Sequence, residues 1–179
     1  MVYITYFVHG TTADNEKGIA TGWLPGELSE TGRQQAEKLG KRIAGQQFDA
    51  IFCSDLKRAV ESTGLTFDSG RDITQDKRLR EANYGSWNGG PHSFKDNMEG
   101  FVDKPFPNGE SYRDVEQRIR EFCDYLKQNY DGKHVAVVAH QAPQLALDVV
   151  LKHKTWPQAI AVDWRKTKAF RPGWAYEIA

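Results

Sequence analysis

The feature that most constrains the fold is the segment His134–Ala139, in which every residue after the histidine is apolar. A run this short has the length of a buried strand. Because side chains in a strand point alternately to the two faces of a sheet, both faces must be covered, as they are in the central strands of parallel sheets. Two further runs, Tyr3–Val8 and Asp49–Cys53, have the same character and predict two more buried strands.

Helical spacing of apolar residues appears between these strands. Ser29 is placed to cap one helix and Ser111 to cap another, and apolar residues recur after each serine at intervals of three and four. Two more helices are expected, one beginning near Asp55 and one running from about Pro143 to Lys152. Strands that alternate with helices indicate an α/β fold with a mainly parallel sheet.

The segment from Tyr84 to Glu110 differs from the rest of the chain. It is rich in Gly, Pro and Asn and has weak periodicity, so it predicts a long irregular excursion, or lid, over one end of the sheet. Some of its larger side chains are expected to line a pocket, among Trp87, His92, Phe94, Lys95, Phe101 and Phe106. Three tryptophans near the C-terminus are instead expected to cover the sheet: Trp156, Trp164 and Trp174. With 179 residues and no internal repeat or linker, the chain is expected to form one domain over residues 1–179.

The composition argues against several classes of partner. Lys plus Arg and Asp plus Glu are both 24, so the formal net charge is zero. Nucleic-acid binding and polybasic membrane attachment both need a basic surplus, so we expect neither a nucleic-acid nor a membrane partner. No apolar run approaches the ~20 residues of a transmembrane helix and no signal-peptide pattern is present, which predicts a cytoplasmic protein. Cys53 and Cys123 lie in apolar predicted elements, where reduced core cysteines are expected.

The residues that follow the predicted strands indicate where the chemistry lies, because open α/β sheets bind ligands at the carboxyl ends of their strands. His9 follows the first strand, Arg58 stands shortly after the second, and His140 follows the third. Each lies near an expected helix start, whose free N–H groups favour an anion. One such residue alone is commonly structural, whereas three at equivalent points of the topology indicate a functional site.

Two histidines with an arginine suit phosphoryl transfer without a metal. A neutral imidazole nitrogen attacks phosphorus in line, while a second imidazole and a guanidinium hold the phosphoryl oxygens. The leaving alkoxide needs a proton, and Glu81, at the start of the irregular segment, is the best-placed acid. The histidines lack metal-ligand spacing, so no metal is expected.

Several short motifs occur in order along nearly the whole chain. They are His9-Gly10-Thr11-Thr12, Leu28-Ser29-Glu30-Thr31-Gly32, Ser54-Asp55-Leu56-Lys57-Arg58-Ala59, Leu79-Arg80-Glu81, Gly85-Ser86-Trp87-Asn88-Gly89, Pro107-Asn108-Gly109-Glu110-Ser111 and Val138-Ala139-His140. In this order they resemble the histidine phosphatase superfamily, in the branch of cofactor-dependent phosphoglycerate mutases and small broad-specificity phosphatases. The resemblance implies a phosphoglycerate-mutase-like α/β fold, a three-layer sandwich whose mainly parallel central sheet is flanked by helices.

The resemblance also implies roles for individual residues. His9 is similar to the histidine that is phosphorylated in the family, and Glu81 is similar to its proton donor. The implied partner is a small phosphorylated substrate, with no organic cofactor. The positions that match phosphate or substrate contacts are Arg58, His140, Asn15, Thr21, Gly22 and Gln141.

Two positions depart from the family pattern. The first family motif is Arg-His-Gly, and here Val8 precedes His9, so a principal phosphate ligand is missing. Either Val8 replaces the arginine directly or one residue is deleted, and the apolar run Tyr6–Val8 slightly favours a deletion. Gln141 occupies a place where the family usually has glycine, whose backbone N–H approaches the phosphate.

Three functions follow from this comparison. The first is a phosphomonoester hydrolase with activity weakened by loss of the arginine. The second is a phosphoglycerate-type mutase, which is disfavoured because the segment between Tyr84 and Glu110 offers only Lys95 and Lys104 and no arginine to clamp a phosphorylated acid. The third is a degenerate member that binds phosphorylated ligands without turnover. The sequence gives no indication of the oligomeric state.

Overall fold

The computed structural model of this chain describes residues 1–67, 70–167 and 173–179. Its centre is a five-stranded sheet in the order β4-β3-β6-β1-β7. The strands β4, β3, β6 and β1 run parallel to one another, and β7 pairs antiparallel to β1 at one edge of the sheet. The strands of this sheet are β1 (Val2–Val8), β3 (Ala50–Cys53), β4 (Ile73–Gln75), β6 (His134–Ala139) and β7 (Trp174–Ile178).

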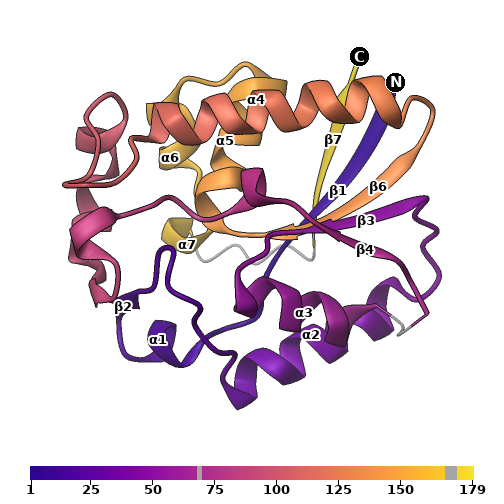
Figure 1. The fold of residues 1–179 in the computed structure, drawn as a ribbon, viewed down its shortest axis with the longest axis horizontal. Helices are drawn as coiled ribbons and strands as arrows, with labels where there is room; N and C mark the ends of the chain where they lie inside the picture. Colours follow the sequence, from indigo (N-terminus) through magenta and orange to yellow (C-terminus); the bar gives the residue numbers. More distant parts are fainter. Residues whose placement is uncertain (68–69, 168–172) are drawn as a thin grey trace.

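Helices cover both faces of the sheet and complete a three-layer sandwich (Figure 1). The helices α4, α5 and α6 lie on one face, and α2 and α3 lie on the other. The helices are α1 (Ala13–Glu16), α2 (Glu30–Ile43), α3 (Lys57–Thr66), α4 (Tyr112–Asn129), α5 (Gln141–Lys152), α6 (Trp156–Ala161) and α7 (Trp164–Thr167). The predicted α/β architecture and the three predicted strands are thus confirmed, whereas β4 and β7 were not predicted.

The helix starts follow the capping chemistry of the sequence. Ser29 caps α2 by accepting from the Gly32 N–H, and Ser111 caps α4 in a capping box with Asp114, so both predicted caps are confirmed. The other two helices begin two residues away from the predicted positions. α3 begins at Lys57, after Leu56 in an extended conformation, and the Asp55 carboxylate before it pairs with Arg80.

The start of α5 illustrates how a proline is tolerated near a helix N-terminus. The helix begins at Gln141, and Pro143 falls at its third residue. The N–H groups of the first turn have no acceptor within the helix, so a proline there removes no intrahelical hydrogen bond. The prediction that the helix starts at Pro143 was therefore two residues late.

The apolar run in β6 is buried on both faces, as its sequence requires. Val135 and Val137 belong to the larger core cluster, which includes residues of α4, α5 and α6. Ala136 and Val138 belong to the second cluster, on the side of α2 and α3. Both cysteines are buried and unpaired, as expected for reduced core thiols.

The irregular segment 84–110 contains only short elements, and its ends are tied together. The Glu110 N–H donates to the Asn83 carbonyl at 2.8 Å, and the Asn83 N–H donates to the Glu110 carboxylate at 2.8 Å. The aromatic rings of Trp87, Phe94 and Phe106 pack against one another within the segment. The elements of this segment are η2 (Gly85–Trp87), β5 (Gly90–Pro91) and η3 (His92–Phe101). β5 pairs with β2 (Ile19–Ala20), and η1 (Lys77–Leu79) lies just before the segment.

Within the ranges that the structure describes, none of the helices has the length and apolar character needed to cross a bilayer.

Candidate active site

The carboxyl ends of β1 and β6 bring two histidines together. His9 follows β1 and His140 follows β6, and the His9 N–H extends the ladder by donating to the Ala139 carbonyl at 3.1 Å. The two ring centroids are 5.0 Å apart, with an angle of 62° between the ring planes. The structure therefore places these side chains in contact at the sheet edge where the topology predicted them.

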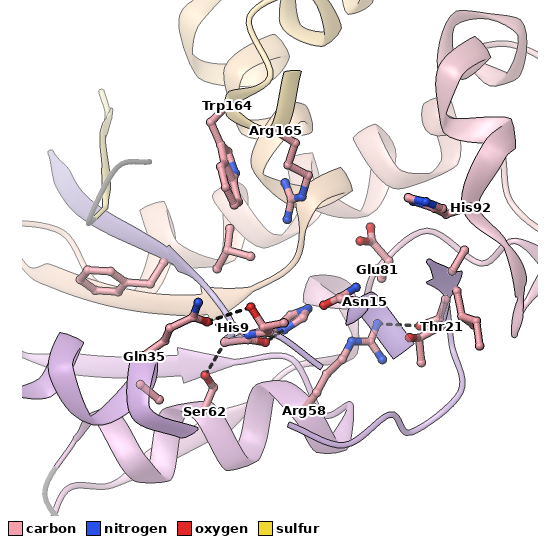
Figure 2. Close-up of a pocket in the computed structure, with 18 of the residues that line it drawn as sticks. His9, Asn15, Thr21, Gln35, Arg58, Ser62, Glu81, His92, Trp164 and Arg165 are labelled. Atoms are coloured by element: carbon pink, nitrogen blue, oxygen red, sulfur yellow. Dashed lines mark hydrogen bonds between the residues drawn. The ribbon is translucent and has the colours of Figure 1, made fainter. Parts of the chain in front are cut away.

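A cavity of about 470 Å³ opens over His9 (Figure 2). That volume is ordinary for a site that takes a small molecule. Three cationic side chains and one carboxylate line it, so the cavity favours an anion when the histidines are neutral. The charged lining residues are Arg58, Lys95, Arg165 and Glu81.

The His9 ring is held in one tautomer. Its Nδ1 lies 2.7 Å from the Gly10 carbonyl oxygen, which only accepts hydrogen bonds, so Nδ1 carries the proton. Burial, together with the Arg58 charge, lowers the pKa of His9 to about 3, although the Gly10 bond opposes that shift. At neutral pH the ring is uncharged, and Nε2 carries a free lone pair.

His140 is buried more deeply than His9. Its side chain is fully inaccessible, and neither ring nitrogen has a hydrogen-bond partner among the residues that the structure describes. Burial is the main cause that holds its pKa well below the usual range, followed by the charges of Arg58 and His9. Its backbone is fixed by the Tyr6 hydroxyl, which donates to the His140 carbonyl at 2.7 Å and accepts from its N–H at 2.9 Å. His140 is not among the residues that line the cavity, and its ring borders the site through its contact with His9.

Arg58 is a buried cation held by backbone oxygens. Its side chain rises from α3 and is only 2% exposed. One terminal nitrogen donates to the carbonyls of Leu24 at 2.9 Å and Pro25 at 3.4 Å, and the other donates to Gly22 at 2.7 Å. Burial lowers the pKa of Arg58, while the Glu81 charge opposes that shift. These bonds fix the guanidinium at the cavity wall.

Glu81 presents a carboxylate to the same cavity (Figure 2). Its Oε1 accepts from the Ala142 N–H at 2.9 Å and from the Ala82 N–H at 3.0 Å. Burial is the largest influence on its pKa and raises it, but the Lys95 charge and the two N–H donors outweigh burial and leave the pKa below its ordinary value. Glu81 is therefore ionised at neutral pH in the unliganded site.

The remaining predicted residues fall into two groups. Asn15, Thr21 and Gly22 line the cavity. Gly22 has a φ of +55°, and a Cβ there would approach the Asn88 side chain to 1.8 Å, so the turn requires glycine. Gln141 is buried at the start of α5 and lies outside the cavity lining, with its side chain turned toward Lys95.

Several lining residues come from outside the strand ends. Of the side chains in the irregular segment that were expected to line a pocket, His92 and Lys95 line the cavity. Trp164 and Trp174 pack in or against the larger core cluster, as expected, and they also line the cavity. Arg165 was not singled out from the sequence at all. It lies on α7, where neither strand order nor a glycine motif marks it.

Comparisons with known proteins identify the family and the fold of the chain. A model of the histidine phosphatase superfamily (branch 1) matches residues 6–163. The chain is 32% identical over 175 residues to a 2,3-bisphosphoglycerate-dependent phosphoglycerate mutase of Allorhizobium ampelinum, covering 87% of this chain and 82% of the relative. It is 26% identical over 157 residues to phosphoserine phosphatase 1 of Hydrogenobacter thermophilus, covering 82% and 74%. A solved mycobacterial glucosyl-3-phosphoglycerate phosphatase superposes with a TM-score of 0.78 at 28% identity, covering 89% of this chain and 86% of that one. The predicted phosphoglycerate-mutase-like fold is thereby confirmed.

Proposed function

Because the chain belongs to branch 1 of the histidine phosphatase superfamily, we propose that it is a phosphomonoester hydrolase that works through a phosphohistidine at His9. The observation that carries the proposal is the state of the His9 ring, which is neutral and has its Nδ1 proton held by Gly10. That state leaves Nε2 as a nucleophile beside a cationic cavity. The substrate class is a small phosphorylated molecule that fits the cavity.

In the first step, Nε2 of His9 attacks phosphorus in line. The N–P bond forms while the P–O bond to the substrate's alcohol breaks, and the alcohol oxygen takes a proton from Glu81. Arg58 and Asn15, which line the cavity, hold the phosphoryl oxygens. His140, whose ring packs against His9 outside the cavity lining, joins them when the substrate is bound. His140 gains the hydrogen-bond partner that it lacks in the unliganded site.

In the second step, water attacks the phosphohistidine. The N–P bond breaks, the Glu81 carboxylate takes the proton of the attacking water, and inorganic phosphate leaves. Glu81 is ionised before substrate arrives, so it has to gain a proton as the substrate binds. A phosphate monoester carries a charge of about −1.5 to −2 at pH 7, and that charge next to the carboxylate raises its pKa.

The charges of the segment 84–110 favour hydrolysis over a mutase reaction. A mutase must hold a second anionic group of its acceptor. Of the two lysines in the segment 84–110, Lys95 lines the cavity, whereas Lys104 is exposed and lies outside its lining. The relatives include a mutase and a phosphatase, so the assay also tests for a mutase reaction. A non-catalytic phosphate binder is the other alternative that the assay distinguishes.

The test is a rapid alkaline quench after the protein is mixed with p-nitrophenyl phosphate. We expect a phosphoryl group on His9 that survives alkali and is lost in acid. His9→Ala should lower turnover on the order of 10⁴-fold or more, because the nucleophile is removed. His153→Asn, at an exposed histidine with a φ of 54°, is the matched control.

Three outcomes separate the candidate functions. Phosphate release that is unchanged by added phosphoglycerate supports the hydrolase. Transfer of the phosphoryl group to phosphoglycerate supports the mutase. Binding of phosphate without release or transfer supports the non-catalytic member, and normal turnover in His9→Ala contradicts the mechanism.

A further inference from the structure

Some of the hydrogen-bond donors around the cavity are already used by other groups of the protein, so fewer remain for a phosphoryl group. A phosphoryl group has three oxygens that need donors as charge moves onto them. Three of the five N–H groups of Arg58 already donate to backbone carbonyls, so Arg58 has two left for a ligand. At the end of β1, the side chain that lines the cavity before His9 is the apolar Val8, which donates nothing. A second cationic donor on another wall of the cavity would complete the set of donors.

Arg165 has the free donor that the cavity needs. Figure 2 shows its guanidinium entering from above, on the side opposite to Arg58, whereas Arg58 and His9 lie beside one another below it. Its Nη1 is buried and has no hydrogen-bond acceptor among the residues that the structure describes. The carboxylate of Asp163 lies 3.7 Å from Nη1, an ion-pair distance beyond hydrogen-bonding range. A buried guanidinium N–H without an acceptor is costly, and a ligand oxygen would remove that cost.

The Arg165 charge already acts on the reacting histidines. Burial is the main cause that lowers the pKa of His9 and of His140, and Arg165 is among the further causes for both. Val8 and Trp164 pack against the same core cluster, so α7 lies on the face of the sheet toward which residue 8 points. Arg165 thus approaches the part of the cavity where Val8 offers no charge.

A chain of polar contacts holds Arg165 in place. The Arg165 N–H donates to the Asp163 carboxylate at 3.2 Å, and Asp163 is buried. The other carboxylate oxygen of Asp163 accepts from the Gln141 side-chain amide. The side-chain oxygen of Gln141, Oε1, accepts from Lys95 Nζ at 3.0 Å. Gln141 follows His140 directly, so this chain of contacts ties two peripheral cations to the fixed end of β6.

We propose that Arg165 is a phosphate-binding residue of this site, with Asp163 and Gln141 as positioning residues that hold it over His9. The ligand group that it takes is an oxygen of the phosphoryl group, in a substrate monoester or in inorganic phosphate. A role of Arg165 in the reaction, beyond phosphate binding, rests on the proposed function. Arg165 lies outside residues 6–163, the part of the chain that matches the family model.

The test measures the binding of orthovanadate and inorganic phosphate as well as turnover. Arg165→Gln should weaken the affinity for both anions by about 10- to 100-fold, the effect of one lost charge-assisted hydrogen bond. Lys166→Gln, at the next and exposed residue of α7, is the matched control and should change neither affinity. Arg165→Lys should recover part of the affinity. Melting temperatures verify that each variant folds.

A second pair of variants tests the proposed arrangement. Val8→Arg in the Arg165→Gln background should restore at least part of the lost vanadate affinity, because residue 8 lines the same cavity. Gln141→Leu should weaken vanadate binding in the wild type and weaken it less in the Arg165→Gln background, since part of its effect passes through Arg165. A merely structural Gln141 would have the same effect in both backgrounds, which would overturn its positioning role.

The outcomes separate the two proposals. Equal vanadate affinity in Arg165→Gln, Lys166→Gln and the wild type overturns the assignment of Arg165, whatever the turnover. A wild type that binds vanadate through Arg165 but forms no phosphohistidine supports the assignment and contradicts the proposed hydrolase. A wild type that binds neither anion contradicts both.

Discussion

The two sides of the cavity are built from different parts of the fold. On one side, His9, His140 and Arg58 lie at strand ends and on a helix that follows a strand, with their backbones inside the sheet or against it. On the other side, Lys95 and Arg165 come from η3 and the four-residue α7. The first side is held by hydrogen bonds to the backbone at the strand ends, such as those of the Tyr6 hydroxyl with His140. The second side is held by hydrogen bonds of the Asp163 and Gln141 side chains.

The difference teaches that reactivity and ligand grip have separate structural origins here. The strand-end side fixes the tautomer of His9 and keeps both imidazoles neutral. The peripheral side contributes positive charge to the cavity, and it depends on one buried carboxylate, Asp163, and one amide, Gln141. Changes on the first side should therefore alter chemistry or stability, whereas changes on the second side should alter affinity.

After loss of the nucleophile His9, the largest effect is expected for the acid. Glu81→Gln should slow the hydrolysis of alkyl phosphates by ~10²–10⁴-fold, the usual contribution of general acid–base catalysis. The loss should be much smaller for p-nitrophenyl phosphate, whose leaving group needs no proton. Turnover of the two substrates by Glu81→Gln and by the exposed control Glu99→Gln tests this. Equal losses on both substrates would give Glu81 a binding or structural role.

The comparison of the two arginines comes next. Arg58→Gln should lower the free energy of unfolding by about 2–4 kcal/mol, because buried carbonyls lose charged donors. Arg165→Gln should change it by less than about 1 kcal/mol, since its guanidinium makes no comparable bonds among the described residues. Urea unfolding of both variants measures the difference. If Arg165→Gln destabilises the fold as much as Arg58→Gln, the two sides are not separable in this way.

Acid should weaken the fold through the strand-end histidines. The pKa of His9 is about 3 in the folded protein and 6.5 ordinarily, so between these values the unfolded chain binds a proton that the folded chain does not. The free energy of unfolding should therefore fall as the pH is lowered from 7 to 5, a range in which ordinary carboxyl groups stay mostly ionised. His140, whose pKa is also lowered, acts in the same direction.

The measurement is the melting temperature at pH 7, 6 and 5, in buffers free of phosphate and sulfate. The His9→Asn variant should show a smaller decrease than the wild type, because one of the two neutral imidazoles is absent. The exposed-site variant His153→Asn should follow the wild type. A wild-type decrease that persists unchanged in His9→Asn would show that His9 is not the cause.

The smallest expected effect is that of metal removal. Two neutral imidazoles beside Arg58, Arg165 and Lys95 form a surrounding that repels a cation. Turnover should therefore be unchanged in EDTA. Loss of activity in EDTA that zinc or magnesium restores would contradict the proposed mechanism.

Much of the fold follows from local sequence patterns. The apolar run in β6 dictates a strand covered on both faces, and Ser29 and Ser111 fix two helix starts through their hydroxyl groups. Strand β7 was missed although Trp174–Ile178 alternates between buried and exposed residues. Five alternating residues do not show where they pair, and their antiparallel partner β1 lies at the other end of the chain.

The sequence by itself determined the order of His9, Arg58 and His140 at the ends of successive strands, because parallel topology sends those ends to one edge. Only the tertiary structure decided the protonation of these groups and the approach of Arg165. The low pKa of His9 results from burial and from the charge of Arg58, which is 49 residues away in the sequence. The place of Arg165 depends on contacts that link α7 to α5 and η3 through Asp163 and Gln141. Burial and side-chain contacts between distant segments are properties of packing, and no local pattern of residues encodes them.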